Sequence, residues 1–228
     1  MSGAPRLTSG LVATLGFLAA VGPFATDMYL ASFTEIAADL GSSASAVQLT
    51  LTAFLLGIGA GQLLLGPLSD RFGRRPVMVL SMGVFALSSV LMVFTPTIEV
   101  FVALRLVQGV AGAAGIVVAR AIAVDLSEGE TAVRALSLIA TVTALGPLVA
   151  PPIGGAVGVL TDWRGVLIVL AAISAAMFLL AVLVAPESLP PDRRHGGGVR
   201  AIARMLGTVA STRGFGAYTL TVAAAFAG

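Results

Sequence analysis

The chain of 228 residues is strongly apolar: 57% of its residues are hydrophobic, 11% are charged, and its mean hydropathy is +1.03. Soluble domains carry about 25% charged residues and a membrane-spanning helix needs about 20 apolar residues, so the composition predicts several membrane spans. The small net charge of +2 and the lack of interleaved aromatic and basic residues argue against nucleic-acid binding. The absence of cysteine excludes disulfides and thiolate metal sites.

Six apolar stretches are long enough to cross a bilayer. They are, in chain order, residues 7–30, 46–65, 76–94, 99–119, 135–157 and 166–185. Polar or charged connections are expected at residues 31–45, 66–75, 120–134 and 158–165, and a short turn at 95–97.

After the sixth stretch, residues 186–213 are rich in proline, glycine and arginine. Residues 199–210 place apolar side chains on one helical face and arginines elsewhere, which predicts an amphipathic helix at the membrane interface. Residues 214–228 are apolar again but number only 15, too few to cross. We therefore expect a membrane bundle at 1–189, a cytoplasmic linker with an interfacial helix at 190–213, and an incomplete seventh membrane helix at 214–228.

The arginines predict the orientation of the chain. If the six stretches alternate in direction, eleven arginines lie on one side of the membrane, Arg164 lies on the other, and Arg105 lies inside the fourth stretch. Basic residues are enriched in cytoplasmic loops, which predicts a multi-pass protein of the cytoplasmic membrane with a cytoplasmic N-terminus. The eleven are Arg6, Arg71, Arg74, Arg75, Arg120, Arg134, Arg193, Arg194, Arg200, Arg204 and Arg213.

The densest group of charges, residues 66–75, separates the second and third stretches. Its four charges do not suit hydrocarbon, and its glycines suit a tight turn between closely packed helix ends. The order of its residues resembles the loop between the second and third helices of the major facilitator superfamily, which latches helix ends on the cytoplasmic side. An ordinary basic turn is the alternative. The resemblance implies a cytoplasmic gating loop made by Gly66, Asp70, Arg71, Gly73, Arg74 and Arg75.

Arg105 stands alone among apolar residues of the fourth stretch. An arginine inside a membrane costs at least a few kcal/mol and normally faces an aqueous cavity or a partner. Residues 104–114 resemble the fourth-helix motif of the superfamily, in which the arginine is associated with proton coupling. A structural arginine bound to backbone carbonyls is the alternative. The motif comprises Arg105, Gln108, Gly109 and Gly112.

Asp27 lies near the outer end of the first stretch. Because the first span runs outward and the fourth inward, Asp27 and Arg105 both fall in the outer half, and we expect a cross-helix ion pair that couples transport to protons. A carboxylate balanced between burial and a nearby arginine can exchange a proton as its surroundings change. An interfacial or helix-capping Asp27 is the alternative. Residues 27–30 resemble drug exporters of the bicyclomycin- and chloramphenicol-resistance type within the superfamily.

The fifth stretch contains three prolines and three glycines within residues 144–155. Proline removes a backbone donor and kinks a helix, whereas glycine allows close packing, so we expect a bent helix pressed against a neighbour. The pattern resembles the fifth-helix motif of antiporters, which uptake symporters generally lack. A kinked packing helix is the alternative. The motif comprises Gly146, Pro147, Ala150, Pro151, Gly154 and Gly155.

A weak internal repeat agrees with this resemblance. The spacing of Gly66, Leu68 and Asp70 recurs in Gly158, Leu160 and Asp162, which overlays spans one to three on spans four to six. Units of three spans have opposite topologies, as in inverted transporter repeats, although chance similarity is the alternative. We therefore predict an all-α membrane protein, the N-terminal six-helix half of a major facilitator fold with a 3+3 inverted repeat, truncated in helix seven.

The resemblance implies proton-coupled efflux, by antiport, of small hydrophobic drugs or antibiotics, with the drug, protons and lipid bilayer as partners. We expect no enzymatic activity, cofactor or metal, because no catalytic constellation stands out. The alternatives are a proton-coupled uptake symporter, or a non-transporting half that associates with a full transporter. Because transporters of this family have two facing halves, we expect the 228 residues to need a C-terminal half or an oligomer partner and to support no efflux alone.

Overall fold

The computed structural model describes residues 7–194. Within this range the secondary structure is entirely helical, and six helical segments are long and apolar enough to cross a membrane. This confirms the predicted all-α class and the number of spans within the described range. The predicted interfacial helix at 199–210 and the apolar stretch at 214–228 lie outside the described residues.

The first span is built from several short helices. They are α1 (Ser9–Ala19), α2 (Val21–Asp27), the 3-10 turn η1 (Leu30–Ser32) and α3 (Phe33–Asp39). The Thr8 side chain caps α1 by accepting a hydrogen bond from the Leu11 backbone at 3.2 Å. The break after Ala19 follows from Pro23, which has no N–H to donate to the carbonyl four residues earlier. Residues 31–45, expected to be a polar connection, instead contain α3.

Five longer helices complete the described bundle. They are α4 (Ala44–Phe72), α5 (Arg74–Val93), α6 (Ile98–Asp125), α7 (Gly129–Leu160) and α8 (Trp163–Val184), followed by the 3-10 turn η2 (Pro191–Arg193). Several extend further than the apolar stretches that predicted them. Apolar runs mark the hydrocarbon core, whereas charged residues that favour helix continue the same helix into the interface.

Two predicted connections therefore shrink. Residues 66–75 do not form a ten-residue turn: α4 continues through Pro67 to Phe72, and α5 begins at Arg74. The reversal is made at Gly73, whose φ of 104° is a conformation that side chains with a Cβ rarely adopt. Likewise, the expected connection at 120–134 is reduced to residues 126–128.

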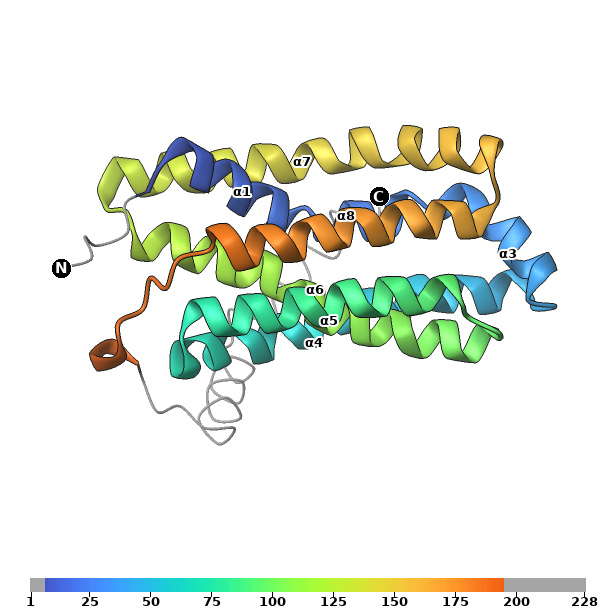
Figure 1. Cartoon of the computed structure of the whole chain (residues 1–228), viewed down its shortest axis with the longest axis horizontal. Coiled ribbons are helices and arrows are strands. Elements are labelled where there is room, and N and C mark those ends of the chain that lie inside the picture. Colours follow the sequence, from blue (N-terminus) through green and yellow to red (C-terminus); the bar gives the residue numbers. More distant parts are fainter. Residues whose placement is uncertain (1–6, 195–228) are drawn as a thin grey trace, which may run out of the picture. The chain divides into compact units, whose positions relative to one another are not determined.

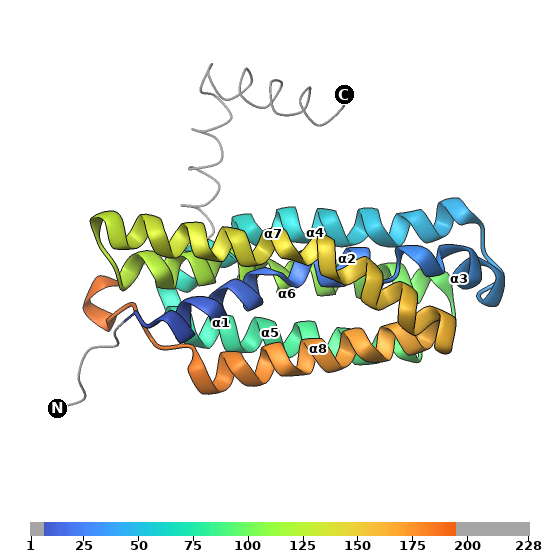
Figure 2. The same cartoon turned by 90° about the horizontal axis from the view of Figure 1, so that it is seen from above.

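The helices run back and forth along one axis, so the bundle has two ends (Figures 1 and 2). The start of α1 and the α4–α5 and α6–α7 turns lie at one end, here named the Arg74 end. Helix α3 and the α5–α6 and α7–α8 turns lie at the other, here named the Trp163 end. The two copies of the repeated motif, at the C-terminal parts of α4 and α7, consequently lie at opposite ends of the bundle.

Glycines allow the closest helix contacts. A Cβ added to Gly57 of α4 would overlap the Leu106 carbonyl of α6, and one added to Gly109 of α6 would overlap the Phe54 carbonyl of α4. Small residues let membrane helices approach until their backbones touch. Helices α4 and α6 are thereby packed closely together near the middle of both helices, and this contact holds Arg105 of α6 close to Phe54 of α4.

Candidate functional site

Arg105 is fully buried in the centre of the bundle, with 0% of its surface exposed. Its Nη1 donates to Gln108 Oε1 at 2.7 Å, and its Nη2 donates to the carbonyl of Ala25 at 2.6 Å. The guanidinium carbon lies 4.1 Å from the centre of the Tyr29 ring and 4.9 Å from that of Phe54. Within residues 7–194, its Nε has no hydrogen-bond partner. The charge is therefore held by neutral acceptors and two aromatic faces, which attract cations through their quadrupoles.

The expected ion pair between Asp27 and Arg105 is wrong for this structure. In the described part of the chain, Asp27 makes no ion pair; its Oδ1 accepts a hydrogen bond from the Thr26 hydroxyl at 2.7 Å. Arg105 instead binds the Ala25 carbonyl in the last turn of α2. The last carbonyls of a helix lack intrahelical donors and attract cations, so the end of α2 offers Arg105 an acceptor that competes with the Asp27 side chain.

The other members of the fourth-helix motif surround Arg105 in different ways. Gln108 binds it directly and donates from Nε2 to the Ser89 hydroxyl of α5 at 2.8 Å. Gly109 packs against α4, and a Cβ added to Gly112 would press against the Phe85 ring. The motif thus combines two polar residues that bind one another with two glycines that admit neighbouring helices.

At the Arg74 end, Arg74 joins two turns of the chain. Its Nη1 lies 2.6 Å from Asp70 Oδ1 and 2.6 Å from the Ser69 hydroxyl, and its Nε lies 3.0 Å from Asp125 Oδ2 at the end of α6. Its backbone N–H donates to Glu187 Oε1 at 3.0 Å. The end of α4, the start of α5, the end of α6 and the segment after α8 are thereby connected by charged hydrogen bonds.

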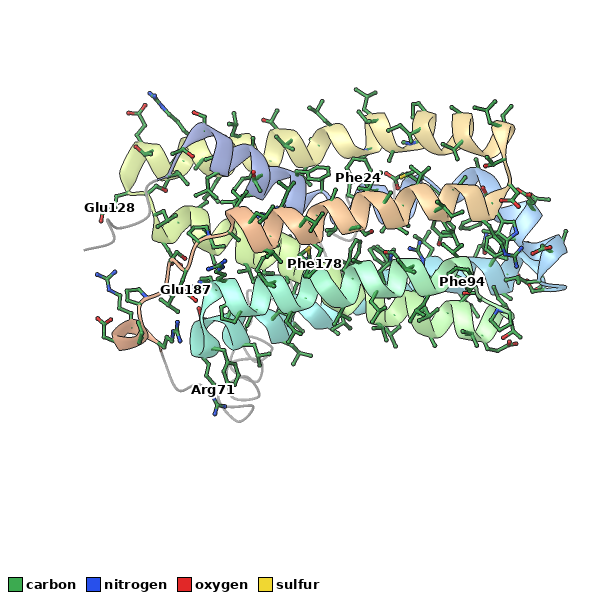
Figure 3. The ribbon with its side chains drawn as sticks, viewed as in Figure 1. Phe24, Arg71, Phe94, Glu128, Phe178 and Glu187 are labelled. Carbon is green, nitrogen blue, oxygen red and sulfur yellow. The ribbon has the colours of Figure 1, made fainter. Side chains whose placement is uncertain are left out.

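The remaining residues of the predicted gating loop differ in their contacts. Arg75 donates to the Val182 carbonyl of α8 at 3.0 Å, and the Arg71 guanidinium lies 5.0 Å from the centre of the Phe72 ring. Gly73 forms the turn, and a Cβ there would also collide with Glu187. A Cβ added to Gly66 would lie 3.4 Å from the Val117 side chain of α6, and the Gly66 carbonyl accepts from the Ser69 hydroxyl at 2.7 Å. Figure 3 shows Arg71 and Glu187 at this end of the bundle.

Asp125 and Glu187 were not predicted as members of this cluster. Asp125 lies in the segment expected to be a charged connection at 120–134, and Glu187 lies near the end of the predicted 1–189 bundle. Sequence spacing does not reveal which carboxylate reaches which arginine. The available signal was that each follows a long apolar stretch ending on the same predicted side as Arg74. Helix ends that share a membrane face are candidates for contact.

The fifth-helix motif divides into two faces on α7. Gly146, Ala150 and Gly154 are buried at intervals of four residues, so they share one side of the helix. A Cβ on Gly146 would collide with Pro23, and one on Gly154 with the Met28 carbonyl. Pro147 and Pro151 are exposed, and Gly155 is half-buried with open space at its Cβ position. The small residues thus press α7 against the first span, while the prolines face away from it.

At the Trp163 end, Asp39 of α3 binds the start of α8. Its Oδ2 accepts hydrogen bonds from Trp163 Nε1 at 3.2 Å and from Arg164 Nη1. Asp162 caps α8 by accepting from the Gly165 backbone at 2.8 Å. Asp162 and Asp70 occupy equivalent places in the repeated motif, but one caps a helix and the other pairs with an arginine.

Comparison with known proteins gives the family. The family profile of the Major Facilitator Superfamily matches residues 15–228. The chain is 42% identical to the uncharacterized MFS-type transporter YdgK of Bacillus subtilis, over 91% of this chain and 52% of the relative. It is 38% identical to a bicyclomycin resistance protein homolog of Haemophilus influenzae, over 85% of this chain and 48% of the relative.

A solved structure gives the same fold. The proton:xylose symporter XylE, at 21% identity, aligns with a TM-score of 0.67 over 88% of this chain and 50% of that one. The chain thus spans about half the length of the curated relatives it matches, 52% and 48% for the two above. The family match, the two relatives and the shared helical architecture lead to one conclusion: this chain belongs to the Major Facilitator Superfamily.

Proposed function

We propose that this chain is the N-terminal half of a proton-coupled exporter of small hydrophobic drugs in the cytoplasmic membrane. The observation that carries the proposal is Arg105, a full charge buried without a carboxylate partner in the described part of a membrane bundle. Ionisable residues inside membrane segments are costly and mark ion or substrate pathways. The similarity to a relative named for bicyclomycin resistance supports drugs as the substrate class.

In this proposal, Asp27 carries the proton and Arg105 responds to it. Arg105 is bound to the Ala25 carbonyl, two residues before Asp27 in the same short helix. An ionised Asp27 attracts the guanidinium, whereas a protonated Asp27 leaves it on the Ala25 carbonyl. The position of the charge, and with it the packing of α2 against α6, then depends on whether the proton is bound. Drug binding that favours one of these positions is coupled to proton release.

The charged cluster formed by Arg74 with Asp70, Asp125 and Glu187, here named the Arg74 cluster, serves as the cytoplasmic latch. The excess of arginine on this side supports a cytoplasmic location. Ion pairs and hydrogen bonds among helix ends can hold one conformation closed, and their rearrangement releases it. The facing half of the transporter and the lipid bilayer are the partners that alternating access requires.

The direction of transport rests on the fifth-helix motif and on the resistance-type relatives. The test is made with inverted membrane vesicles whose lumen has been acidified, prepared from a drug-sensitive host that expresses these 228 residues joined to the facing half of the transporter. Every efflux measurement below uses this complete protein. Adding chloramphenicol or bicyclomycin should release luminal protons if drug and proton exchange. Vesicles carrying Asp27→Asn, at equal abundance, are the matched control. Proton uptake together with the drug would indicate a symporter, and no drug-dependent proton movement would refute coupling.

A further inference from the structure

A line of four polar side chains crosses the middle of the bundle. It runs from Arg105 and Gln108 on α6 through Ser89 on α5 to Ser174 on α8, and every member has 0% exposure. The successive contacts are 2.7 Å from Arg105 Nη1 to Gln108 Oε1, 2.8 Å from Gln108 Nε2 to Ser89 Oγ, and 3.0 Å between the two serine hydroxyls. Neither serine belongs to any of the motifs described above.

The chemistry of the donors sets the direction of this line. A guanidinium has donors only, so the Gln108 oxygen must face Arg105 and its NH2 must face Ser89. Ser89 accepts there, and its single proton is directed to the Phe85 carbonyl at 2.8 Å or to Ser174. When Ser174 donates to the Leu170 carbonyl at 2.7 Å, its oxygen is free to accept from Ser89. The line then runs from the guanidinium to the backbone of α8.

The membrane interior makes each link depend on the next. Water is scarce in the bilayer core, so a lost partner is not replaced there. Without the Ser89 hydroxyl, the Gln108 NH2 loses its acceptor, and rotation of the amide toward another acceptor becomes favourable. Rotation removes the oxygen that Arg105 Nη1 requires, and the guanidinium keeps only the Ala25 carbonyl as its hydrogen-bond acceptor in the described residues.

We propose that Ser89 and Ser174 are positioning residues for Arg105. Through Gln108 they hold the guanidinium against the end of α2, and Ser174 makes its position depend on the placement of α8. The assignment rests on the proposed coupling role of Arg105. If the two serines only packed helices together, their loss would leave the reactivity of Arg105 and the pH profile of efflux unchanged. The positioning role predicts that both change.

Ser88 supplies a matched control. It is the neighbour of Ser89 on α5 and is also buried, with 3% exposure. Its hydroxyl is within hydrogen-bond distance of the Val84 and Phe85 carbonyls of its own helix, at 2.8 and 3.0 Å, and makes no hydrogen bond to any other described residue. Ser88→Ala therefore removes one buried hydroxyl from the same helix without touching the line to Arg105.

The first measurement is proton-driven drug efflux as a function of pH for Ser89→Ala, Ser174→Ala and Ser88→Ala. We expect the first two to lose about fivefold in coupled efflux, the effect of one net hydrogen bond, and to show a flatter pH profile. Ser88→Ala should match the wild type. Equal behaviour of all three variants at equal abundance would overturn the assignment.

The second measurement needs no transport. Arg105 in the purified protein is modified with 2,3-butanedione, and the rate is followed by mass spectrometry of its peptide. Ser89→Ala and Ser174→Ala should react several-fold faster than the wild type and Ser88→Ala. If the wild type shows no pH-dependent efflux, the proposed function fails, yet these rates still decide whether the serines hold Arg105: unchanged rates overturn the assignment.

A double variant removes the whole middle of the line. Gln108→Leu with Ser89→Ala leaves no amide donor without its hydroxyl acceptor, but it also deprives Arg105 Nη1 of the Gln108 oxygen. Measured at equal abundance, Arg105 should be at least as reactive as in Ser89→Ala. A wild-type modification rate in this variant would show that the line does not position Arg105.

Discussion

Arg105 and Arg74 are both buried arginines, but they are held in opposite ways. Arg74, 9% exposed, binds the carboxylates of Asp70 and Asp125. Arg105, 0% exposed, binds a backbone carbonyl, the Gln108 amide and two aromatic rings. Arg74 lies at one end of the bundle, at the start of α5, and Arg105 lies in its interior.

The difference follows from the cost of a second charge. At the surface, the carboxylates stay partly solvated: the side chain of Asp70 is 47% exposed and that of Asp125 is 20% exposed. In the interior, an ionised carboxylate would itself have to be desolvated, whereas neutral acceptors and aromatic faces stabilise the arginine without this cost. Arg74 thus belongs to an ion-pair cluster, whereas Arg105 has no carboxylate partner in the described residues and, in the proposed mechanism, is the charge whose position a single proton at Asp27 changes.

Replacing Arg105 should have the largest effect. Arg105→Ala removes two charged hydrogen bonds worth roughly 3 kcal/mol together, so coupled efflux should fall by about 100-fold. Arg105→Lys should restore it only in part, because an ammonium cannot reproduce the fork of the guanidinium. Efflux rates in vesicles, normalised to abundance, measure both variants. Full activity in Arg105→Lys would show that charge alone suffices.

Asp27→Asn tests the proposed proton carrier, which lies two residues after the Ala25 carbonyl that binds Arg105. We expect coupled efflux to fall about tenfold, a common size for coupling between sites, and to lose its dependence on the pH gradient. Drug binding to the purified protein should persist, because the amide has nearly the shape of the carboxyl. An unchanged pH dependence would exclude Asp27 from the mechanism.

Asp70→Asn tests the surface cluster. Solvent screens the ion pair between Asp70 and Arg74, so the loss of this pair should cost about 1 kcal/mol, equivalent to about fivefold in efflux. Arg74 retains Asp125 and Ser69, and membrane insertion should be normal. The double variant with Asp125→Asn should lose more than the two single variants together, because both carboxylates share one arginine. Normal efflux in Asp70→Asn would rule out the latch.

The smallest effect is expected for the exposed pair Glu130–Arg134 on α7, whose side chains are 79% and 77% exposed. Glu130→Gln should change the stability of the purified protein by less than about 0.5 kcal/mol and leave efflux unchanged. Thermal unfolding in detergent measures the first quantity. A larger loss would mean that ion pairs at this end are stronger than their exposure suggests.

Composition and periodicity were sufficient to predict the six spans, the burial of Arg105 and the turn near Gly73, because hydrocarbon excludes charge and dictates the length of a span. The ends of the helices were less predictable. Apolar runs stop at the edge of the hydrocarbon, while helices α4 and α6 continue through charged residues to Phe72 and Asp125.

The partners of each charge were decided by tertiary structure alone. Sequence reasoning paired Arg105 with Asp27, but the break in the first span places the Ala25 carbonyl against the guanidinium. It grouped the glycines and prolines of α7 into one motif, but packing buries Gly146 and Gly154 against the first span and leaves Pro147 and Pro151 exposed. The amino-acid sequence by itself determines which groups must leave water, because hydrophobicity belongs to each residue. The acceptor of each buried donor depends on how whole helices are rotated and shifted along their axes relative to one another. These relative positions are set by the close glycine contacts of the assembled bundle.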